Sequence, residues 1–389
     1  MATHVGIIDQ DPVRLVTALL HRKFKAEKVI FIGVECQRSQ YEQLSQVLTP
    51  KGFETEFFLI PSDINIPLIK GKIEELASRL KDEGTEVFFN ASCGLRHRLL
   101  TAYEIFRTYN WPIYVIEPFS DELCWLYPYG RGQEQVEDHI NISDYLTIFG
   151  ARCELPEDDI RTVLDTTIET VGHKWASNAY ELGPGLATLN YLATTCRKAQ
   201  KLDVELSDKQ QGYRELGMLI DDLTDAGLST YQNGVLTFSS EAARRFANGE
   251  WLEWYVHHIV EEIKRELLTI QDLSLGVQVY RQIGDKEVRN ELDVATVVNN
   301  KLHIIECKTK GMSSDGDDTL YKLESIRDLL GGLQARAMLV SFRPLRHHDI
   351  TRATDLGLAL IGPDQLGDLK THLHEWFLRA GGHDKGLFD

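Results

Sequence analysis

Charged residues are set into two adjoining apolar segments in the last third of the chain. The first segment, residues 290–298, reads Asn-Glu-Leu-Asp-Val-Ala-Thr-Val-Val, and the second, residues 301–308, reads Lys-Leu-His-Ile-Ile-Glu-Cys-Lys. Two such segments around an Asn-Asn pair predict a β-hairpin with a two-residue turn. Counting outward from that turn places Asp293 opposite Glu306.

The same count places Glu291 opposite Lys308. Because residues two apart on a strand share a face, all four side chains point the same way. Directly opposed side chains have Cβ atoms about 5 Å apart, so Asp293 and Glu306 would repel each other. A divalent cation between them would turn this repulsion into attraction. Such a cation prefers oxygen ligands, and the backbone carbonyl of Cys307 can supply a third.

The alternative is a surface hairpin whose charges are solvated, with Lys308 and Glu291 forming a cross-strand ion pair. The second segment is too apolar for a fully exposed edge strand, because it contains Leu302, Ile304 and Ile305. We therefore expect the charges at its end to lie in a cleft.

Asp293 followed by Glu306-Cys307-Lys308 resembles the active-site motif of the PD-(D/E)xK nuclease superfamily. The resemblance implies that Asp293, Glu306 and Lys308 are catalytic. It also implies that Asp293, Glu306 and the Cys307 carbonyl hold Mg²⁺ or Mn²⁺. The chain would then be a metal-dependent phosphodiesterase, an endonuclease.

A helix is predicted from about residue 249, because apolar residues recur at helical spacing from Leu252 onward. In PD-(D/E)xK nucleases, a glutamate on the helix before the sheet often completes the metal site. By this resemblance Glu253 is the candidate. Glu250 is its competitor, and a plain surface charge is the alternative for both residues.

The first 145 residues alternate strand-like and helix-like segments, which predicts an open, mostly parallel α/β sheet. Ligands of such sheets bind beyond the carboxyl ends of the strands. There, residues 90–96 read Asn-Ala-Ser-Cys-Gly-Leu-Arg and lead from a strand into a helix, whose N-terminus offers free N–H groups to an anion. The alternative is a well-capped helix after a buried strand.

The pattern Asn-x-Ser-x-Gly-x-Arg is similar to the Asn-x-Thr-Gly-Gly-Thr-Lys signature of CARF domains, the Rossmann-like sensors of CRISPR systems. It departs from that signature at Cys93, Leu95 and Arg96, where the family usually has Gly, Thr or Asn, and Lys. CARF domains bind cyclic oligoadenylates across a homodimer. By resemblance, the residues lining the pocket would be Gln10, Arg38, Asn90, Ser92, Gly94 and Arg96.

Residues 146–248 are predicted to form a linker and a winged-helix-like region, because helices precede a hairpin with an Asn-Gly turn at Asn233-Gly234. Asp221, Asp222 and Asp225 make the candidate recognition helix acidic, so phosphates would be repelled. We therefore expect a structural or dimerising role rather than DNA recognition. Residues 249–389 would form the nuclease domain.

The composition limits the possible partners and compartments. A net charge of −17 over 389 residues argues against non-specific coating of nucleic acid. No apolar segment is long enough to span a membrane, and no signal peptide is visible. Six scattered cysteines without a CxxC pair favour a reducing cytoplasm and disfavour a zinc site.

Over nearly its full length, the chain resembles the CARF-fused PD-(D/E)xK ancillary nucleases of type III CRISPR defence. This resemblance implies a homodimer activated by cyclic tetra-adenylate that cleaves single-stranded RNA, DNA or both, and nicks duplex DNA. Two alternatives stay open. One is a ligand-responsive CARF and winged-helix transcription regulator with an inactive nuclease domain, and the other is an endonuclease that needs no messenger.

Overall fold

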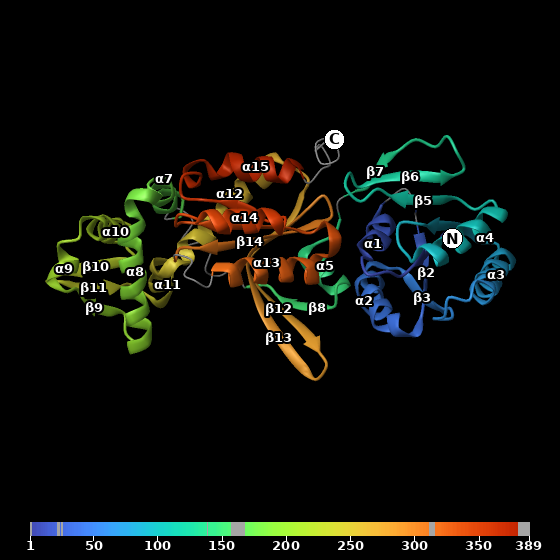
Figure 1. The fold of residues 1–389 in the computed structure, drawn as a ribbon, viewed down its shortest axis with the longest axis horizontal. Helices are drawn as coiled ribbons and strands as arrows, with labels where there is room; N and C mark the ends of the chain where they lie inside the picture. Colours follow the sequence, from blue (N-terminus) through green and yellow to red (C-terminus); the bar gives the residue numbers. More distant parts are fainter. Residues whose placement is uncertain are drawn as a thin grey trace.

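The protein has three parts in a row: an N-terminal α/β domain, a central domain built on a mixed sheet, and a helical part at the far end (Figure 1). These coordinates come from a computed structural model. They describe residues 2–21, 24, 26–137, 139–156, 168–310 and 316–379.

The N-terminal domain is built on a seven-stranded sheet with the order β3-β2-β1-β4-β5-β6-β7, in which β1 to β5 are parallel. The strands are β1 (Ala2–Ile7), β2 (Ala26–Gly33), β3 (Glu54–Leu59), β4 (Glu86–Asn90), β5 (Ile113–Ile116), β6 (Glu122–Tyr127) and β7 (Glu134–Gln135). The helices are α1 (Val13–Leu20), α2 (Arg38–Leu48), α3 (Ile66–Glu83) and α4 (Arg96–Thr108). The predicted α/β class and Rossmann-like sheet are confirmed.

Helices cover both faces of this sheet because its central strands are apolar on both sides. Val29 and Phe31 face the core formed with α1 and α2, whereas Ile30 and Ile32 face the core formed with α3 and α4. Because β1, β2 and β4 are parallel, the loops that follow them gather at one edge of the sheet.

The central domain has a six-stranded sheet with the order β16-β15-β14-β13-β12-β8. Its strands are β8 (Ala151–Glu154), β12 (Ile270–Ile283), β13 (Lys286–Val298), β14 (Lys301–Lys308), β15 (Arg336–Ser341) and β16 (Ala359–Ile361). Its helices are α5 (Ile142–Ile148), α12 (Trp251–Glu266), α13 (Gly316–Gly331), α14 (His347–Asp355) and α15 (Leu369–Arg379).

One domain boundary differs from the expectation. Strand β8 lies in the segment predicted to be a linker, yet it pairs with β12 and forms the edge of the central sheet. Helix α5, just before it, packs on the same sheet through Tyr145 and Leu146. The sequence did not reveal this because a four-residue edge strand carries little periodicity of its own.

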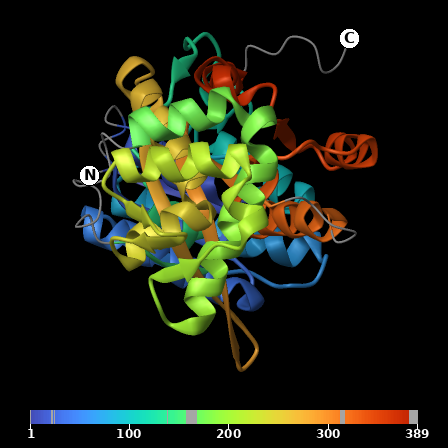
Figure 2. The ribbon, with the colours of Figure 1, turned by 90° about the vertical axis from the view of Figure 1, so that its left-hand side faces the viewer.

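The helical part contains α7 (His173–Ser177), α8 (Ala179–Ala199), α9 (Asp208–Gln211), α10 (Arg214–Asp225) and α11 (Glu241–Arg245). A three-stranded sheet with the order β10-β11-β9 lies beside them, formed by β10 (Ser229–Gln232), β11 (Val235–Phe238) and β9 (Asp203–Glu205). The β10–β11 hairpin turns at Asn233-Gly234, both with positive φ, as predicted. Figure 2 shows these helices stacked over the end of the central domain.

Not every acidic residue on α10 faces solvent. Asp222 is buried and accepts hydrogen bonds from Lys174 and from the Trp175 indole N–H. The charge of Asp222 alone had suggested that it repels phosphates. Its carboxylate instead holds α10 against α7. Asp221 and Asp225 are exposed.

Apolar contacts join the three parts. Residues of α1 and α2 share one continuous core with α5, α13 and one face of the central sheet. The opposite face packs on α12 and α15, and that core continues into α8 and α10. The central sheet thus has the N-terminal domain on one side and the helical part on the other. Within the described ranges, no helix is long and apolar enough to cross a membrane.

Candidate active site

The predicted hairpin is present, and it lies in the middle of the central sheet. Asn299 and Asn300 both have positive φ, as a tight two-residue turn requires. The β13–β14 ladder runs in the predicted register from Val298–Lys301 to Val294–Ile305. Because both strands have neighbours on their outer sides, neither is an exposed edge.

The ladder ends at Val294–Ile305, three pairs short of the Glu291–Lys308 pair that the counting predicted. Beyond Val294–Ile305, the carboxylate of Asp293 accepts a hydrogen bond of 2.8 Å from the Cys307 N–H. Beyond this point β13 continues its pairing with β12, whose Gly276 has φ +64°. Asp293 and Glu306 are therefore close, but they are not a regular cross-strand pair.

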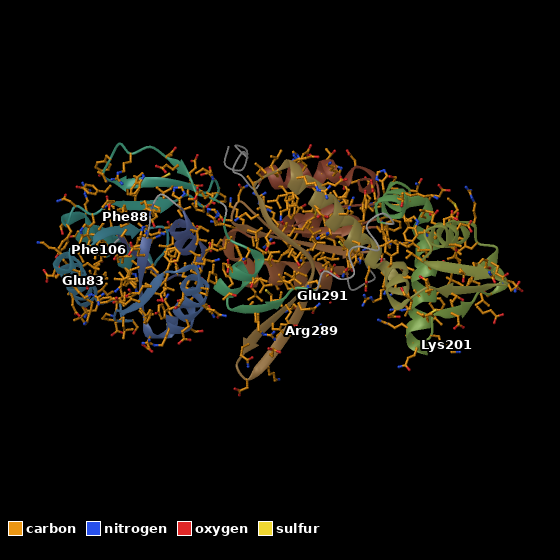
Figure 3. The ribbon with its side chains drawn as sticks, turned by 180° about the vertical axis from the view of Figure 1, so that it is seen from behind. Glu83, Phe88, Phe106, Lys201, Arg289 and Glu291 are labelled. Carbon is orange, nitrogen blue, oxygen red and sulfur yellow. The ribbon has the colours of Figure 1, made fainter. Side chains whose placement is uncertain are left out.

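From here outward, β12 and β13 project from the sheet as a long two-stranded arm (Figure 1). Glu291 lies where the arm leaves the domain, and Arg289 lies further out (Figure 3). The β13–β14 ladder has already ended at Val294–Ile305, and Glu291 lies opposite Gln278 of β12, so the expected pairing of Glu291 with Lys308 is wrong.

Helix α12 brings Glu253 to the end of this hairpin. The helix is positioned by Gly249, which has φ +120° and lies so close to Thr309 that any Cβ there would collide with the threonine hydroxyl. Trp251, in the first turn, is fully buried and packs edge-on against Trp175 and Phe342 at ring-centroid distances of 5.3 and 5.2 Å. These contacts leave little freedom for the start of the helix.

Burial and repulsion between carboxylates raise the pKa values of Glu253 and Asp293 in this cluster. Burial raises the pKa of Glu253 well above its ordinary value of 4.5, and repulsion from neighbouring carboxylates adds to the shift. In decreasing order of effect these neighbours are Asp293, Glu250, Glu291 and Glu306. Burial and the charge of Glu306 likewise raise the pKa of Asp293. The cluster therefore disfavours full ionisation without a compensating cation.

Lys308 supplies the positive charge of the cluster. Its ammonium donates a hydrogen bond to Glu306, and the two side chains are 35% and 15% exposed. Burial, the largest single effect, lowers the pKa of Lys308, but the charge and hydrogen bond of Glu306 together with the charge of Asp293 raise it overall. Lys308 is thus held charged beside the acids, as the motif predicts.

The donor chemistry fits a hard divalent cation. Asp293, Glu306 and the Cys307 carbonyl are the predicted ligands, and Glu253 or Glu250 could add a further carboxylate. Within the described ranges, no three His, Cys, Asp or Glu side chains are gathered in metal-binding geometry. The Asp293 carboxylate accepts a hydrogen bond from the Cys307 N–H, and the Glu306 carboxylate accepts one from Lys308. The assignment of these residues as metal ligands therefore stays a prediction. Crowded acids with raised pKa values are the feature that a cation would relieve.

In the N-terminal domain, Asn90 and Ser92 hold the loop between β4 and α4 together. The buried Asn90 amide donates to the Arg14 carbonyl (3.0 Å) and accepts from the Ser92 N–H and hydroxyl (3.0 and 2.5 Å). The Ser92 hydroxyl in turn accepts from the Ile116 N–H at 2.8 Å. Both side chains shape the loop from inside, and their direct contact with a ligand stays a prediction.

Gly94 lets the β4–α4 loop pack closely against the end of β1 and the loop that follows it. Its φ is +119°, and a Cβ there would lie 2.9 Å from Ile7. Its N–H donates to Asp9, whose other carboxylate oxygen accepts from the N–H of Gln10. Asp9 therefore joins two of the predicted ligand loops, a role that its sequence position did not reveal.

The other predicted pocket residues lie at this edge but are not all brought together. Arg96 is exposed at the start of α4. Arg38 pairs with Glu35 at 2.6 Å and stacks over Phe57. Gln10 lines a cavity of about 1160 Å³ between the N-terminal and central domains, which the other five do not line.

Comparison with known proteins identifies the family. Residues 240–380 match the family model described as "Card1-like, endonuclease domain". The whole chain is 68% identical to protein VC1899 from Vibrio cholerae. The match to its crystal structure covers 98% of this chain and 99% of that one, with a TM-score of 0.95. The chain belongs to this family, the CARF-domain ancillary nucleases with a Card1-like endonuclease domain.

More distant structures share the fold. Can2 from Sulfobacillus thermosulfidooxidans, solved in complex with cyclic tetra-adenylate, is 21% identical, with a TM-score of 0.78 and coverage of 97% of this chain and 99% of Can2. A type III CRISPR defence DNA nuclease activated by cyclic oligoadenylate is 14% identical, with a TM-score of 0.55 and coverage of 95% and 51%. No curated protein matches the chain.

The cleft of this CARF-domain nuclease includes residues that sequence reasoning missed. A cavity of about 390 Å³ is lined by Glu250, Glu253 and Glu291, together with Arg245 and Trp254. Asp293, Glu306 and Lys308 do not line it, but the charges of Asp293 and Glu306 act on Glu253, which does. Arg245 could have been noticed as a basic residue shortly before the Glu250–Glu253 segment. Trp254 is partly buried and also packs against the core of the domain.

The acidic cluster predicts that Glu253→Gln stabilises the metal-free protein. Below about pH 4.5, Glu253 is protonated in both the folded and unfolded states, so its shifted pKa does not change the free energy of unfolding. As the pH rises above 4.5, the unfolded chain ionises while the folded one holds its proton, so stability falls. At pH 8 in EDTA, we expect the variant to gain about 1–3 kcal/mol in free energy of unfolding, measured by thermal or denaturant unfolding.

The matched control is Glu261→Gln, at an exposed position on the same helix, which should leave stability nearly unchanged. A Glu253→Gln variant no more stable than the wild type at pH 8 would contradict the crowding of charges in the cleft.

Proposed function

We propose that the protein is a divalent-metal-dependent nuclease activated by cyclic tetra-adenylate. In this proposal it cleaves single-stranded RNA, DNA or both and nicks duplex DNA, in type III CRISPR defence. The observation that carries the proposal is the cluster of mutually repelling acids beside Lys308, on a domain of the Card1-like endonuclease family. The complex of the similarly folded Can2 with cyclic tetra-adenylate supports the choice of activator.

The residues of the cleft divide the chemistry between them. Asp293, Glu306 and the Cys307 carbonyl would hold Mg²⁺ or Mn²⁺, with Glu253 as a fourth candidate. When bound, this ion activates water and offsets the charge that develops on a phosphodiester. Lys308 stabilises the negative charge of the phosphate at the moment of cleavage.

Activation also calls for a homodimer, because a two-fold symmetric ring is best bound by the same surface supplied twice. The starts of α3 and α4 expose apolar side chains beside the Arg96 loop, and the two helices pack side by side. This α3–α4 apolar patch consists of Ile64, Ile66, Leu68, Leu95 and Leu100. Exposed apolar patches of this kind commonly mark protein interfaces, which supports a dimer through this face.

The two alternative functions are not equally supported. The match to an endonuclease domain favours an enzyme over a transcription regulator, and Asp221 and Asp225 keep the exposed face of α10 acidic. An endonuclease that needs no messenger would share the same cleft, so it is distinguished by the ligand dependence of cleavage.

We expect Glu306→Ala and Lys308→Ala each to lower the rate of cleavage by a hundredfold or more, because each removes a charge at the reacting phosphate. Binding of cyclic tetra-adenylate should be retained, since both residues lie far from the β4–α4 loop. Gel assays of cleavage and calorimetry of ligand binding measure the two effects. Lys310→Ala, at an exposed lysine two residues further on, is the matched control, and normal cleavage by either active-site variant would refute the assignment.

Purified protein with Mn²⁺ should cleave labelled single-stranded RNA or DNA much faster when cyclic tetra-adenylate is added, because the ligand must favour the active arrangement. Parallel reactions with cyclic tri- and hexa-adenylate test the ring size, and EDTA should abolish cleavage. Equal cleavage with and without every ring would instead support the messenger-independent endonuclease.

Leu100→Glu should convert the dimer to a monomer, because it places a charge in the α3–α4 apolar patch, where Leu100 is 67% exposed. Light scattering at several protein concentrations measures the change. Leu268→Glu, at a leucine 88% exposed outside the patch, is the control and should stay dimeric. A wild-type monomer, or a dimeric Leu100→Glu variant, would contradict this interface.

A further inference from the structure

The turn of the catalytic hairpin is buried against the N-terminal domain. Hairpin turns usually lie at the surface, where water satisfies their polar groups. Here Asn300 is 3% exposed and Lys301 is 4% exposed, although one carries an amide and the other a charge. Buried polar groups of this kind are retained only where partners satisfy them.

Those partners come from the loop between β5 and β6. The Asn300 side-chain amide donates to the Asp121 carboxylate at 2.6 Å, and the Lys301 ammonium donates to the Phe119 carbonyl at 2.5 Å. Asp121 is itself 5% exposed. Burial raises the pKa of Asp121 to about 6, against the opposing effects of Asn300 and Lys301, as expected for a junction with little water.

Gln271 of β12 fixes the turn from its other side. Its side-chain oxygen accepts from the Asn300 backbone N–H at 2.6 Å, and its side-chain nitrogen donates to the Asn300 side-chain oxygen at 2.8 Å. The same nitrogen donates to the carbonyl of Ile140. The turn is thus clamped between the N-terminal domain and the neighbouring strand, so both sides would have to move together.

The loop that holds the turn is continuous with the predicted ligand loop. Strand β5 ends at Ile116, whose N–H donates to the Ser92 hydroxyl at 2.8 Å. The next residue, Glu117, accepts from the N–H groups of Phe119 and Ser120, both at 2.7 Å. A shift at Ser92 would therefore be passed to Asp121 through one short, internally bonded loop.

On the other side, β14 leads directly from the turn to the active site. Glu306 is six residues beyond Asn300, a distance of about 20 Å along a strand. Strand β14 is paired along both sides, with β13 and β15. A strand in the middle of a sheet does not bend easily, so displacement of the turn would move Glu306 and Lys308 with it.

We propose that Asp121, Asn300 and Lys301 form a joint through which the β4–β5 edge of the sensor positions the catalytic hairpin. The three are positioning residues: they act through β13 and β14 on Asp293, Glu306 and Lys308. This inference rests on the proposed function. Ligand bound at the Ser92 loop shifts the joint, and the joint sets how the acids at the far end of the hairpin face the substrate.

The test exchanges donor and acceptor across the joint. Asn300→Asp opposes two carboxylates and breaks the 2.6 Å hydrogen bond, whereas the double variant Asn300→Asp/Asp121→Asn restores an amide–carboxylate pair in reverse. At pH 8 with Mn²⁺ and saturating cyclic tetra-adenylate, we expect Asn300→Asp to lower kcat at least tenfold with KM changed less than threefold. The double variant should recover most of kcat, and both variants should still bind the ligand by calorimetry.

Asn299→Asp, which changes the neighbouring turn residue, is the matched control and should cleave normally. Thermal unfolding reports whether each variant folds, and rescue by the double variant separates a broken joint from general damage. Unchanged kcat in Asn300→Asp, or a loss that the double variant does not rescue, would overturn the joint.

The outcome for the wild type separates this inference from the proposed function. If wild-type cleavage does not depend on any cyclic oligoadenylate, the proposed activation is wrong. In that case the kcat values of the wild type, Asn300→Asp and the double variant are compared without any cyclic oligoadenylate. Loss in Asn300→Asp with recovery in the double variant would still support hairpin positioning, and equal rates would contradict it.

Discussion

Repulsion among partly buried carboxylates is the constraint on which this structure depends. Glu253 and Asp293 are held where little water screens their charges, with Glu250, Glu306 and the exposed Glu291 around them. Such an arrangement costs folding free energy, so it persists only because the surrounding structure holds it. Lys308 offsets part of the repulsion, and the rest is available to attract a cation.

The scaffold that holds these acids is built from both sides of one sheet. The start of α12 is fixed by the fully buried Trp251 and by the lack of space at Gly249. The hairpin itself lies between β12 and β15, so its two strands cannot separate without opening the sheet. Activity and stability therefore draw on the same contacts, and the repulsion in the cleft is balanced by apolar packing behind it.

The same sheet also explains how a sensor could act on a nuclease. One of its faces shares a core with α1 and α2 of the N-terminal domain, and the turn of its central hairpin enters that domain. A short path of hydrogen bonds links the β4–α4 loop to this turn. Coupling of this kind needs no long-range change of fold, because the hairpin runs from the active site to the loop that is hydrogen-bonded to Ser92.

The sequence by itself determined the hairpin, its Asn-Asn turn, its register as far as Val294–Ile305, and the α/β class of the first domain. These features follow from local periodicity and turn chemistry, which each segment carries on its own. The sequence also predicted that Asp293, Glu306 and Lys308 lie close together, because their spacing follows the strand repeat.

Only the tertiary structure decided what depends on contacts between distant segments. It ended the β13–β14 ladder at Asp293, made β8 an edge strand of the central sheet, and buried Asp222 beneath Lys174 and Trp175. It also brought Arg245 into the cleft and Asn300 against Asp121. Apart from Arg245, which precedes the Glu250–Glu253 segment closely, none of these has a local signal, because each contact depends on a partner on another segment of the chain.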